Sequence, residues 1–456
     1  MIKTRRQPPE PGQRPTLRSF KIGAAALLLL LAGCSDGSFF GEKEGPPLPG
    51  TRVAILEASR SIIPQAEVAG VQVTVPAPEE RVNWPQSVGR ASHVGGNPAL
   101  AQTLQVLWRN TDAVGAKDEA RRPLSPPIIA NGRVFVLDAV LNVRAYDAET
   151  GEELWAVGTA PPGEHDGFGG GLATDGVRVY VAGGHSQALA LEADTGRLFW
   201  RKDLPGPVRS APTTRDGQLF IVTADNRLIA LRTEDGERIW DVPGGSTGAA
   251  LLGGASPAAN NDAVVAALTT GEVLAVRRAN GRGVWRNSLA ALRRFDFGAK
   301  LSDIAGHPVL TNDAVYAVSA AGRAAAFSLR TGNAIWEQRV GSTQTPWVAG
   351  DWVYIMTTDA ELVCLDRHRG FVRWVVALPR YEDVEDQSGE YFYAGPVMAG
   401  GNLVLVRSDG ELSLHSPETG AVIGTFDAGD DVILPPVIAN QALYILADNG
   451  ALTALR

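Results

Sequence analysis

The chain has 456 residues, which is enough for two or three ordinary domains or for one large repeat array. It contains 45% hydrophobic and 20% charged residues, with only two Cys against ten Trp, which argues against a disulfide scaffold, a Cys-ligated zinc site and an attached haem. The first 33 residues hold six Lys or Arg and one acid, so the remainder has 36 basic and 49 acidic residues, a net charge of -13 that argues against nucleic acid as a partner.

The N-terminus has the pattern of a secretion signal. The basic stretch leads into an apolar run of twelve residues, 22–33, which is too short to span a bilayer and is followed by Cys34. The sequence Leu31-Ala-Gly-Cys34 resembles a bacterial lipobox, so residues 1–33 are predicted to be a lipoprotein signal peptide and Cys34 the lipid-bearing residue. Ser35, where Asp would favour retention in the inner membrane, favours the outer membrane. The alternative is that the run belongs to a transmembrane anchor.

Two irregular segments follow the predicted lipid anchor. Residues 34–50 are rich in Gly, Pro and charge, as expected of a flexible tether. Residues 51–102 contain five prolines, which prevent any long regular element. We expect this second segment to extend along the surface of the main domain.

A tryptophan repeat organises the rest of the chain. Six copies have a turn ending in Gly, then three residues, then Trp, and a seventh copy has Gly424 in place of the indole. Successive tryptophans stand 45, 40, 45, 51 and 38 residues apart, the spacing of four-stranded propeller blades. The six complete copies end in Trp155, Trp200, Trp240, Trp285, Trp336 and Trp374.

A second marker shows how the ring closes. A Pro lies 23 residues before the turn in six of the seven copies, a position suited to the start of a strand. Pro436 begins an eighth copy, but the chain stops at Arg456 before an outer strand, whereas residues 103–108 form a strand without a blade. Residues 103–456 are therefore predicted to be an all-β, eight-bladed β-propeller of four-stranded antiparallel blades, the last closed by the N-terminal strand.

The repeat also resembles the propellers of the pyrroloquinoline quinone enzymes. Those enzymes typically carry a vicinal Cys pair and carboxylate or amide ligands for Ca²⁺, whereas Cys364 is the only Cys between residues 103 and 456. It stands five residues before its turn, where five other copies have Ala, so we interpret it as a small core residue. No catalytic residue, metal site or cofactor is predicted. A periplasmic quinone-dependent oxidoreductase, or a degenerate quinone-binding propeller, remains the alternative.

Two connections between blades are candidates for partner binding. Residues 244–254 lead to Pro257, and residues 288–304 form the longest connection, with Arg293, Arg294, Phe295 and Asp303. Exposed Arg and aromatic residues are enriched in protein interfaces. The alternative is a loop that only folds back on its own blades.

The lipobox, the tether and the propeller together resemble the BamB family, lipoproteins of the outer-membrane β-barrel assembly machinery. A local match supports this, because Lys300-Leu-Ser-Asp303-Ile304 is similar to a family Arg-Leu-Ser-Asp-Val run. The resemblance implies a non-catalytic scaffold on the periplasmic face of the outer membrane. It also implies binding to the POTRA domains of BamA, contact with other subunits of the machinery, and assistance to unfolded outer-membrane proteins.

In the family, the partner-binding loops carry a Leu-Ser-Leu-Arg segment and two acids. The corresponding positions here are Ala249–Leu252, with Leu252 in the Arg position, and Ala305 in place of the second acid. Arg293 or Arg294 could supply the missing cation. A periplasmic adaptor with another partner is a further possibility. The predicted contact residues are Leu251, Leu252, Arg293, Arg294, Phe295, Leu301 and Asp303.

Overall fold

The computed structural model describes residues 62–116, 122–161, 169–245, 251, 253–290 and 303–456. The chain divides into Met1–Ser59 and Arg60–Arg456, and all described residues belong to the second unit. The predicted signal peptide, Cys34 and the tether lie outside the described residues. Within the described ranges, no helix is both long enough and apolar enough to cross a bilayer.

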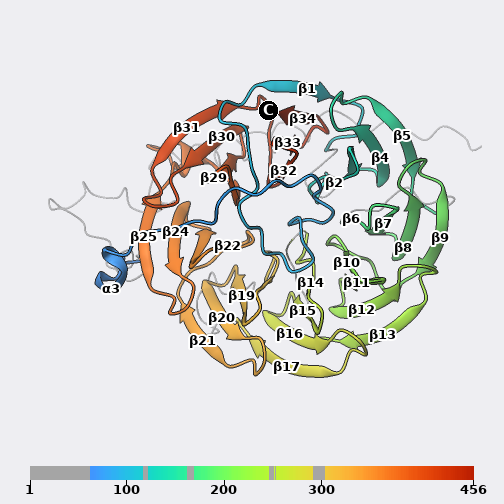
Figure 1. Ribbon diagram of the computed structural model, residues 1–456, viewed down its shortest axis with the longest axis horizontal. Coiled ribbons are helices and arrows are strands. Elements are labelled where there is room, and N and C mark those ends of the chain that lie inside the picture. The colour runs from blue at the N-terminus through green and yellow to red at the C-terminus, as the bar shows by residue number, and fades with distance from the viewer. Residues whose placement is uncertain (1–61, 117–121, 162–168, 246–250, 252, 291–302) are drawn as a thin grey trace, which may run out of the picture. The chain divides into compact units, whose positions relative to one another are not determined.

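The predicted eight-bladed propeller is confirmed. Eight four-stranded antiparallel sheets follow one another around a ring (Figure 1). Within most blades the second and third strands are buried and the outer strand is half-exposed, which explains the nearly continuous apolar runs in the inner part of each repeat.

The strands of the first four blades have the following bounds. Blade 1 contains β2 (Ile128–Ala130), β3 (Arg133–Leu137), β4 (Asn142–Asp147) and β5 (Glu153–Gly158). Blade 2 contains β6 (Gly170–Thr174), β7 (Arg178–Gly183), β8 (Gln187–Glu192) and β9 (Leu198–Asp203). Blade 3 contains β10 (Thr213–Arg215), β11 (Gln218–Val222), β12 (Arg227–Arg232) and β13 (Arg238–Pro243). Blade 4 contains β14 (Ala258–Ala259), β15 (Ala263–Ala267), β16 (Glu272–Arg277) and β17 (Gly283–Ser288).

The remaining four blades complete the ring. Blade 5 contains β18 (Val309–Leu310), β19 (Ala314–Ser319), β20 (Arg323–Ser328) and β21 (Ala334–Gln338). Blade 6 contains β22 (Trp347–Ala349), β23 (Trp352–Met356), β24 (Glu361–Asp366) and β25 (Val372–Ala377). Blade 7 contains β28 (Tyr393–Ala399), β29 (Asn402–Arg407), β30 (Glu411–His415) and β31 (Val422–Asp427). Blade 8 contains β32 (Val437–Ala439), β33 (Ala442–Leu446), β34 (Leu452–Leu455) and β1 (Val106–Asn110).

Ring closure by an N-terminal strand is also confirmed. β1 pairs antiparallel with β34, with Val106 opposite Leu455 and Asn110 opposite Leu452. The strand begins three residues later than the predicted 103–108. Gln105 nevertheless continues the ladder, because its N–H and C=O bond to Arg456 at 3.1 and 2.9 Å. The outer strand of blade 8 thus comes from the opposite end of the domain.

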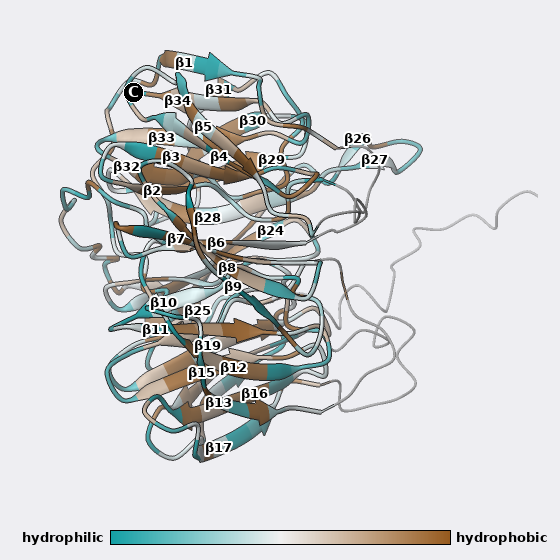
Figure 2. Ribbon diagram, turned by 90° about the vertical axis from the view of Figure 1, so that its right-hand side faces the viewer, coloured by the Kyte–Doolittle hydropathy of each residue, from teal (hydrophilic) through white to brown (hydrophobic). Residues whose placement is uncertain are grey.

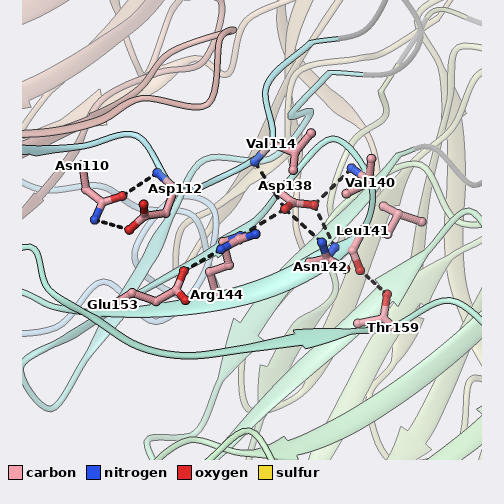
Figure 3. A network of polar contacts seen from close by, with 10 residues as sticks. All are labelled: Asn110, Asp112, Val114, Asp138, Val140, Leu141, Asn142, Arg144, Glu153 and Thr159. Carbon is pink, nitrogen blue, oxygen red and sulfur yellow. Dashed lines mark hydrogen bonds and ion pairs between the residues drawn. The ribbon is translucent and has the colours of Figure 1, made fainter.

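A buried carboxylate fixes the passage from blade 8 to blade 1 (Figure 3). Asp138 is 1% exposed and accepts hydrogen bonds from the Asn142 N–H at 2.8 Å and from Arg144 Nε at 3.2 Å. It also receives the Val114 N–H, 3.4 Å away, from the segment that follows β1. Arg144 continues the network to Glu153 on β5. These bonds hold the closing segment against the first blade.

The seven repeat tryptophans lie between neighbouring blades. Each indole N–H donates to a backbone carbonyl of the next blade, at 2.8 to 3.1 Å. The turn glycine of that next blade has φ between 69° and 75°, and an added Cβ would lie 2.5 to 2.8 Å from the indole. Glycine is therefore required for two reasons: it adopts the positive φ of the turn, and it leaves space for the indole. The pairs, Trp first, are Trp108–Gly151, Trp155–Gly196, Trp200–Gly236, Trp240–Gly281, Trp285–Gly332, Trp336–Gly370 and Trp374–Gly420.

The predicted prolines mark the inner strands. Six of them stand immediately before the first residue of an inner strand, where the missing N–H disrupts no ladder. Pro396 differs, because it lies inside β28 where the pairing with β29 is irregular. The six are Pro127, Pro212, Pro257, Pro308, Pro346 and Pro436.

The two ends of the ring differ. The connections between blades lie at one end, here called the loop face, and the turns that carry the repeat glycines lie at the other, the turn face. A hairpin of β26 (Tyr381–Asp383) and β27 (Ser388–Glu390) connects blades 6 and 7 and projects from the loop face (Figure 2). The described part of residues 51–102 lies on the turn face and rim.

Residues 79–101, here called the plug, cross the centre of the ring (Figure 1). They hydrogen-bond to all eight blades in order. The Arg81 C=O bonds to Asn440 of blade 8, and the chain then bonds to blades 1 to 7 and returns to blade 8 at Gln441. One plug residue for each of blades 1 to 7, in order, is Trp84, Pro85, Gln86, Ala91, Ser92, Gly96 and Pro98.

Candidate partner-binding site

The two predicted loops lie side by side in the ring, one between blades 3 and 4 and the other between blades 4 and 5. Both stems of the longer loop are fixed. Leu289 is fully buried and its C=O accepts the Ser319 hydroxyl at 3.1 Å, while Ile304 is 1% exposed and packs in the same core. Both described ends of this connection are thus anchored in the core.

Asp303 joins the two loops. Its Oδ2 accepts the backbone N–H of Leu251 at 2.7 Å, and its own C=O accepts the N–H of Ala320 at 3.0 Å. The side chain is 1% exposed, and its Oδ1 has no hydrogen-bond partner among the described residues. Burial raises the pKa of this carboxyl, and the Leu251 N–H and Arg209 oppose the rise. Asp303 therefore positions the Leu251 backbone.

His307 extends the connection to a third loop. The ring Nδ1 of His307 accepts the backbone N–H of Ser256 at 2.8 Å, and the backbone N–H of His307 donates to the Thr345 hydroxyl at 3.0 Å. Burial, with a smaller contribution from His93, lowers the pKa of His307 to about 3, so the ring is neutral at pH 7. Three consecutive connections between blades are therefore hydrogen-bonded into one base on the loop face.

The structure brings two of the predicted contact residues together, Leu251 and Asp303. The other five lie outside the described residues: Leu252, Arg293, Arg294, Phe295 and Leu301. The burial of Asp303 could not be expected from the sequence, since its bond to Leu251 spans 52 residues. The role of all seven in partner binding stays a prediction.

The plug limits the open space in the described part of the central channel. The plug fills it from the turn face, where Trp84 stacks on Trp347 with ring centroids 6.5 Å apart. The cavity beside these rings, also lined by His307 and Pro396, has a volume of about 30 Å³. That volume holds about two water molecules. Among the described residues, no three His, Cys, Asp or Glu side chains converge as metal ligands.

Two other groups have reactive side chains but lie in the core. Ser413 Oγ is 2.9 Å from His415 Nε2, a spacing that would suit a nucleophile and its base, but the two residues are 7% and 1% exposed. Cys364 is fully buried opposite Trp374, at the register of Ala145 opposite Trp155, and burial raises the pKa of its thiol. Both groups are therefore parts of the packed core of their blades.

Sequence reasoning missed the plug. Trp84, Gln86 and His93 lie in the irregular segment and are 1%, 5% and 1% exposed. Gln86 bonds to the backbone of Thr214 in both directions at 3.0 Å, and His93 Nδ1 lies 2.8 Å from the Pro308 carbonyl. The available signal was Trp84, a tryptophan outside the repeat register, since a large aromatic residue in an irregular segment indicates burial.

Comparisons with known proteins agree with this architecture. The family model described as outer membrane protein assembly factor BamB matches residues 141–376, more than half of the chain. The chain is 25% identical over 335 residues to the BamB of Moranella endobia, covering 72% of this chain and 84% of that relative. It is 27% identical over 338 residues to the BamB of Escherichia coli, covering 72% and 83%.

Solved structures are similar in fold. The crystal structure of BamB from Moraxella catarrhalis has a TM-score of 0.62 at 20% identity, covering 78% of this chain and all of that chain. A europium-containing methanol dehydrogenase has a TM-score of 0.64 at 14% identity, covering 80% and 89%. These likenesses indicate the propeller fold alone, whereas the family match over residues 141–376 is specific: the chain belongs to the family of the outer membrane protein assembly factor BamB.

Proposed function

We propose that the chain is a non-catalytic scaffold of the β-barrel assembly machinery. In this role it binds the POTRA domains of BamA and assists the folding and insertion of outer-membrane β-barrel proteins. We further propose that it is attached through a lipid on Cys34 to the periplasmic face of the outer membrane. Membership of the BamB family supports an assembly factor as opposed to an enzyme.

The observation that carries the proposed BamA site is the bond between Leu251 and Asp303. It joins two loops whose counterparts bind BamA in the family, and it does so from a base fixed by Leu289, Ile304 and His307. A rigid base reduces the conformational entropy that is lost when loops bind a partner. Arg293, Arg294 and Phe295 follow Leu289 in the chain and supply the residue types of interface hot spots.

The test is co-purification with BamA from detergent-solubilised membranes. Arg293→Glu with Arg294→Glu is expected to reduce recovery of BamA at least tenfold, because charge reversal at a buried interfacial contact costs several kcal/mol. Arg330→Glu is the matched control, since Arg330 is exposed in a turn of the opposite face. Unchanged recovery of BamA with the double variant would refute the site, and loss with Arg330→Glu would place the contact elsewhere.

A second pair of variants tests whether Asp303 positions the shorter loop. Asp303→Ala removes the acceptor of the Leu251 N–H and should displace the shorter loop while the arginines remain. Asp303→Asn retains an acceptor oxygen and should restore recovery of BamA. Equal loss with both variants would contradict the positioning role of Asp303.

A further inference from the structure

Two histidines meet where the plug crosses blades 4 and 5. His93 of the plug is 1% exposed, and its ring centroid lies 5.3 Å from that of His307, in the connection that enters blade 5. His307 is partly buried, and it lines the small cavity beside Trp84. The plug is thus in direct contact with the loop face through this histidine pair.

The hydrogen bonds of the pair fix which ring nitrogens carry a proton. His93 Nδ1 lies 2.8 Å from the Pro308 carbonyl, which only accepts, so Nδ1 is protonated and Nε2 is bare. His307 Nδ1 accepts the backbone N–H of Ser256, so that nitrogen is bare. His93 Nε2 has no hydrogen-bond partner among the described residues. A proton added to His93 therefore meets no acceptor, and a proton added to His307 removes the acceptor of the Ser256 N–H.

The charges around the pair do not compensate such protons. Burial lowers the pKa of His93, and burial together with His93 lowers that of His307. The charged side chains on the elements around the pair are Glu79, Arg81 and Arg90 in the plug, and Arg209 and Asp303 on the loop face. Within the described part of the chain, none of them contributes to the pKa of either histidine. Two protonated rings would therefore repel each other without compensation.

The inner strands that the plug meets at this point are the shortest in the ring. β14 and β18 have two residues each, whereas the inner strands of the other blades have three or more. Ala259 of β14 donates its N–H to the Ala91 C=O at 2.6 Å, and Leu310 of β18 donates to the Ser92 C=O at 2.8 Å. Both short strands are thus stabilised by the plug segment that leads into His93.

Other contacts hold the segment before and after the histidine. α3 (Ala66–Ala69) lies beside β25 of blade 6, where the Gln65 N–H donates to the Val372 C=O at 2.8 Å (Figure 1). Trp84 exchanges two backbone hydrogen bonds with Ile129 of blade 1, at 2.7 and 2.8 Å. Opening of the plug at His93 can therefore stay local, because neither contact involves blade 4 or blade 5.

We propose that His93 and His307 form an acid-sensitive switch that releases residues 90–95 of the plug from blades 4 and 5. Each ring binds a proton more tightly once the contact has opened, so acid favours the open form. In that form the bonds from the plug to β14 and β18 are lost, together with the Ser256 bond on the loop face. The switch is a property of the plug and the ring, and it holds whether or not the loops bind BamA.

Hydrogen exchange of the full chain in detergent, measured by mass spectrometry and corrected for intrinsic exchange, tests the switch. The reporters are the backbone N–H groups of Ser256, Ala259 and Leu310, and β7 and β8 of blade 2 are the reference. The histidine pKa values are about 4 and about 3 in the closed form and 6.5 when exposed, so the opening constant of the reporters should rise about a thousandfold between pH 7 and pH 4.5. A rise below about tenfold, or an equal rise in the reference strands, would overturn the proposal.

Asparagine variants identify the source of the response. His93→Asn keeps a donor for the Pro308 carbonyl and His307→Asn keeps an acceptor for the Ser256 N–H, but neither side chain titrates. Each variant should reduce the rise at least tenfold. His368→Asn, at an exposed histidine in a turn of blade 6, is the matched control and should respond as the wild type does. An unchanged response in either variant of the pair would contradict the switch.

The wild-type chain alone decides the matter if a variant loses the protection of β7 and β8 at pH 7. The logarithm of the opening constant should then change by about two per pH unit between pH 6 and pH 4.5, as expected for two protons. A change of about one or less would show that the two histidines do not act together.

Discussion

Seven of the eight blade junctions are built in one way and the junction between blades 7 and 8 in another. At the seven, an indole from one blade packs on the turn glycine of the next and donates to its backbone. Blade 8 has no such turn, because its third strand ends the chain and its fourth strand is β1. An indole in blade 7 would have no turn to contact. The substitution of Gly424 for Trp is therefore a consequence of how the ring closes.

The interior of blade 7 compensates for the missing indole. In the docked blades a small residue stands opposite the Trp, as Ala230 does opposite Trp240, whereas Leu414 stands opposite Gly424. In blade 7 the large side chain is on the third strand and the small residue is on the outer strand, the reverse of the other blades, and this exchange helps to preserve packing volume. The plug bridges this junction, since Pro98 bonds to Gly400 of blade 7 and Ala101 bonds to Gln441 of blade 8. The Trp–Gly contact is therefore a property of two consecutive blades and not of a single blade.

Removing an indole should destabilise a Trp–Gly junction more than any other single change. Trp240→Ala should lower the free energy of unfolding by about 3–5 kcal/mol, because it leaves a cavity and removes the bond to the Arg278 carbonyl. Urea titration of the full chain measures the change. Trp84→Ala, which removes a tryptophan of the plug, serves for comparison. A loss below about 1 kcal/mol for Trp240→Ala would show that the junctions do not depend on docking.

Lowering the pH tests the plug separately, because His93 in the plug can be protonated and the indoles cannot. Burial lowers the pKa of His93 to about 4, against 6.5 for the unperturbed group. Between pH 6.5 and 4 the unfolded chain binds a proton that the folded chain does not, so stability falls as pH falls. His93 alone accounts for about 3 kcal/mol over that range. Stability curves measured at several pH values should show this loss.

The matched variant for the acid test is His93→Asn. His93 has φ of 61°, and Asn both tolerates that conformation and supplies a donor for the Pro308 carbonyl. The variant should have a shallower decline of stability with acid, leaving the part due to His307, whose pKa is lowered to about 3. An unchanged slope would exclude His93 as a source of the pH dependence.

Glycine substitutions sharpen the comparison directly. Gly281 has φ of 69° and an added Cβ would lie 2.8 Å from Trp240, so Gly281→Ala should cost about 1–3 kcal/mol. Gly424 lies in a strand without positive φ, and its nearest neighbour to an added Cβ is Leu414 at 3.8 Å. Gly424→Ala should therefore be neutral or stabilising by about 0.5 kcal/mol. Equal costs in urea titration would contradict the distinction between the two classes of junction.

The smallest expected effect concerns the ion pair between the chain end and blade 1. Arg456 Nη2 lies 2.8 Å from Glu149 Oε2, and both side chains are more than a third exposed. Arg456→Ala should reduce stability by about 0.2–1 kcal/mol, and this difference should shrink in 1 M salt. A loss above about 2 kcal/mol would show that the contact between the chain end and blade 1 depends on charge more than on strand pairing.

The eight blades could be predicted because their signals are local, and their closure could be predicted because residues 103–108 lacked a blade while the last copy lacked an outer strand. Gly281 and Trp285 stand four residues apart, and each copy repeats the same requirement for a tight turn and a large side chain. The plug carries no such period, since its bonds join single residues to eight different blades. The bond of Asp303 to Leu251 likewise depends on how two loops meet across blade 4. Such contacts follow from the assembled ring, so the sequence can indicate that Trp84 is buried but not which residues it meets.

The order of the plug contacts has a consequence for how the ring closes. Residues 84–98 meet blades 1 to 7 in the sequence in which those blades are synthesised, and the segment ends on blade 8. The plug precedes every complete blade in the chain, and its contacts follow the order of the blades. Its last contacts, and the pairing of β1, require residues 440–455, near the C-terminal end of the chain. Early plug contacts therefore do not close the ring, because closure requires residues 81–110 and 440–455 to meet.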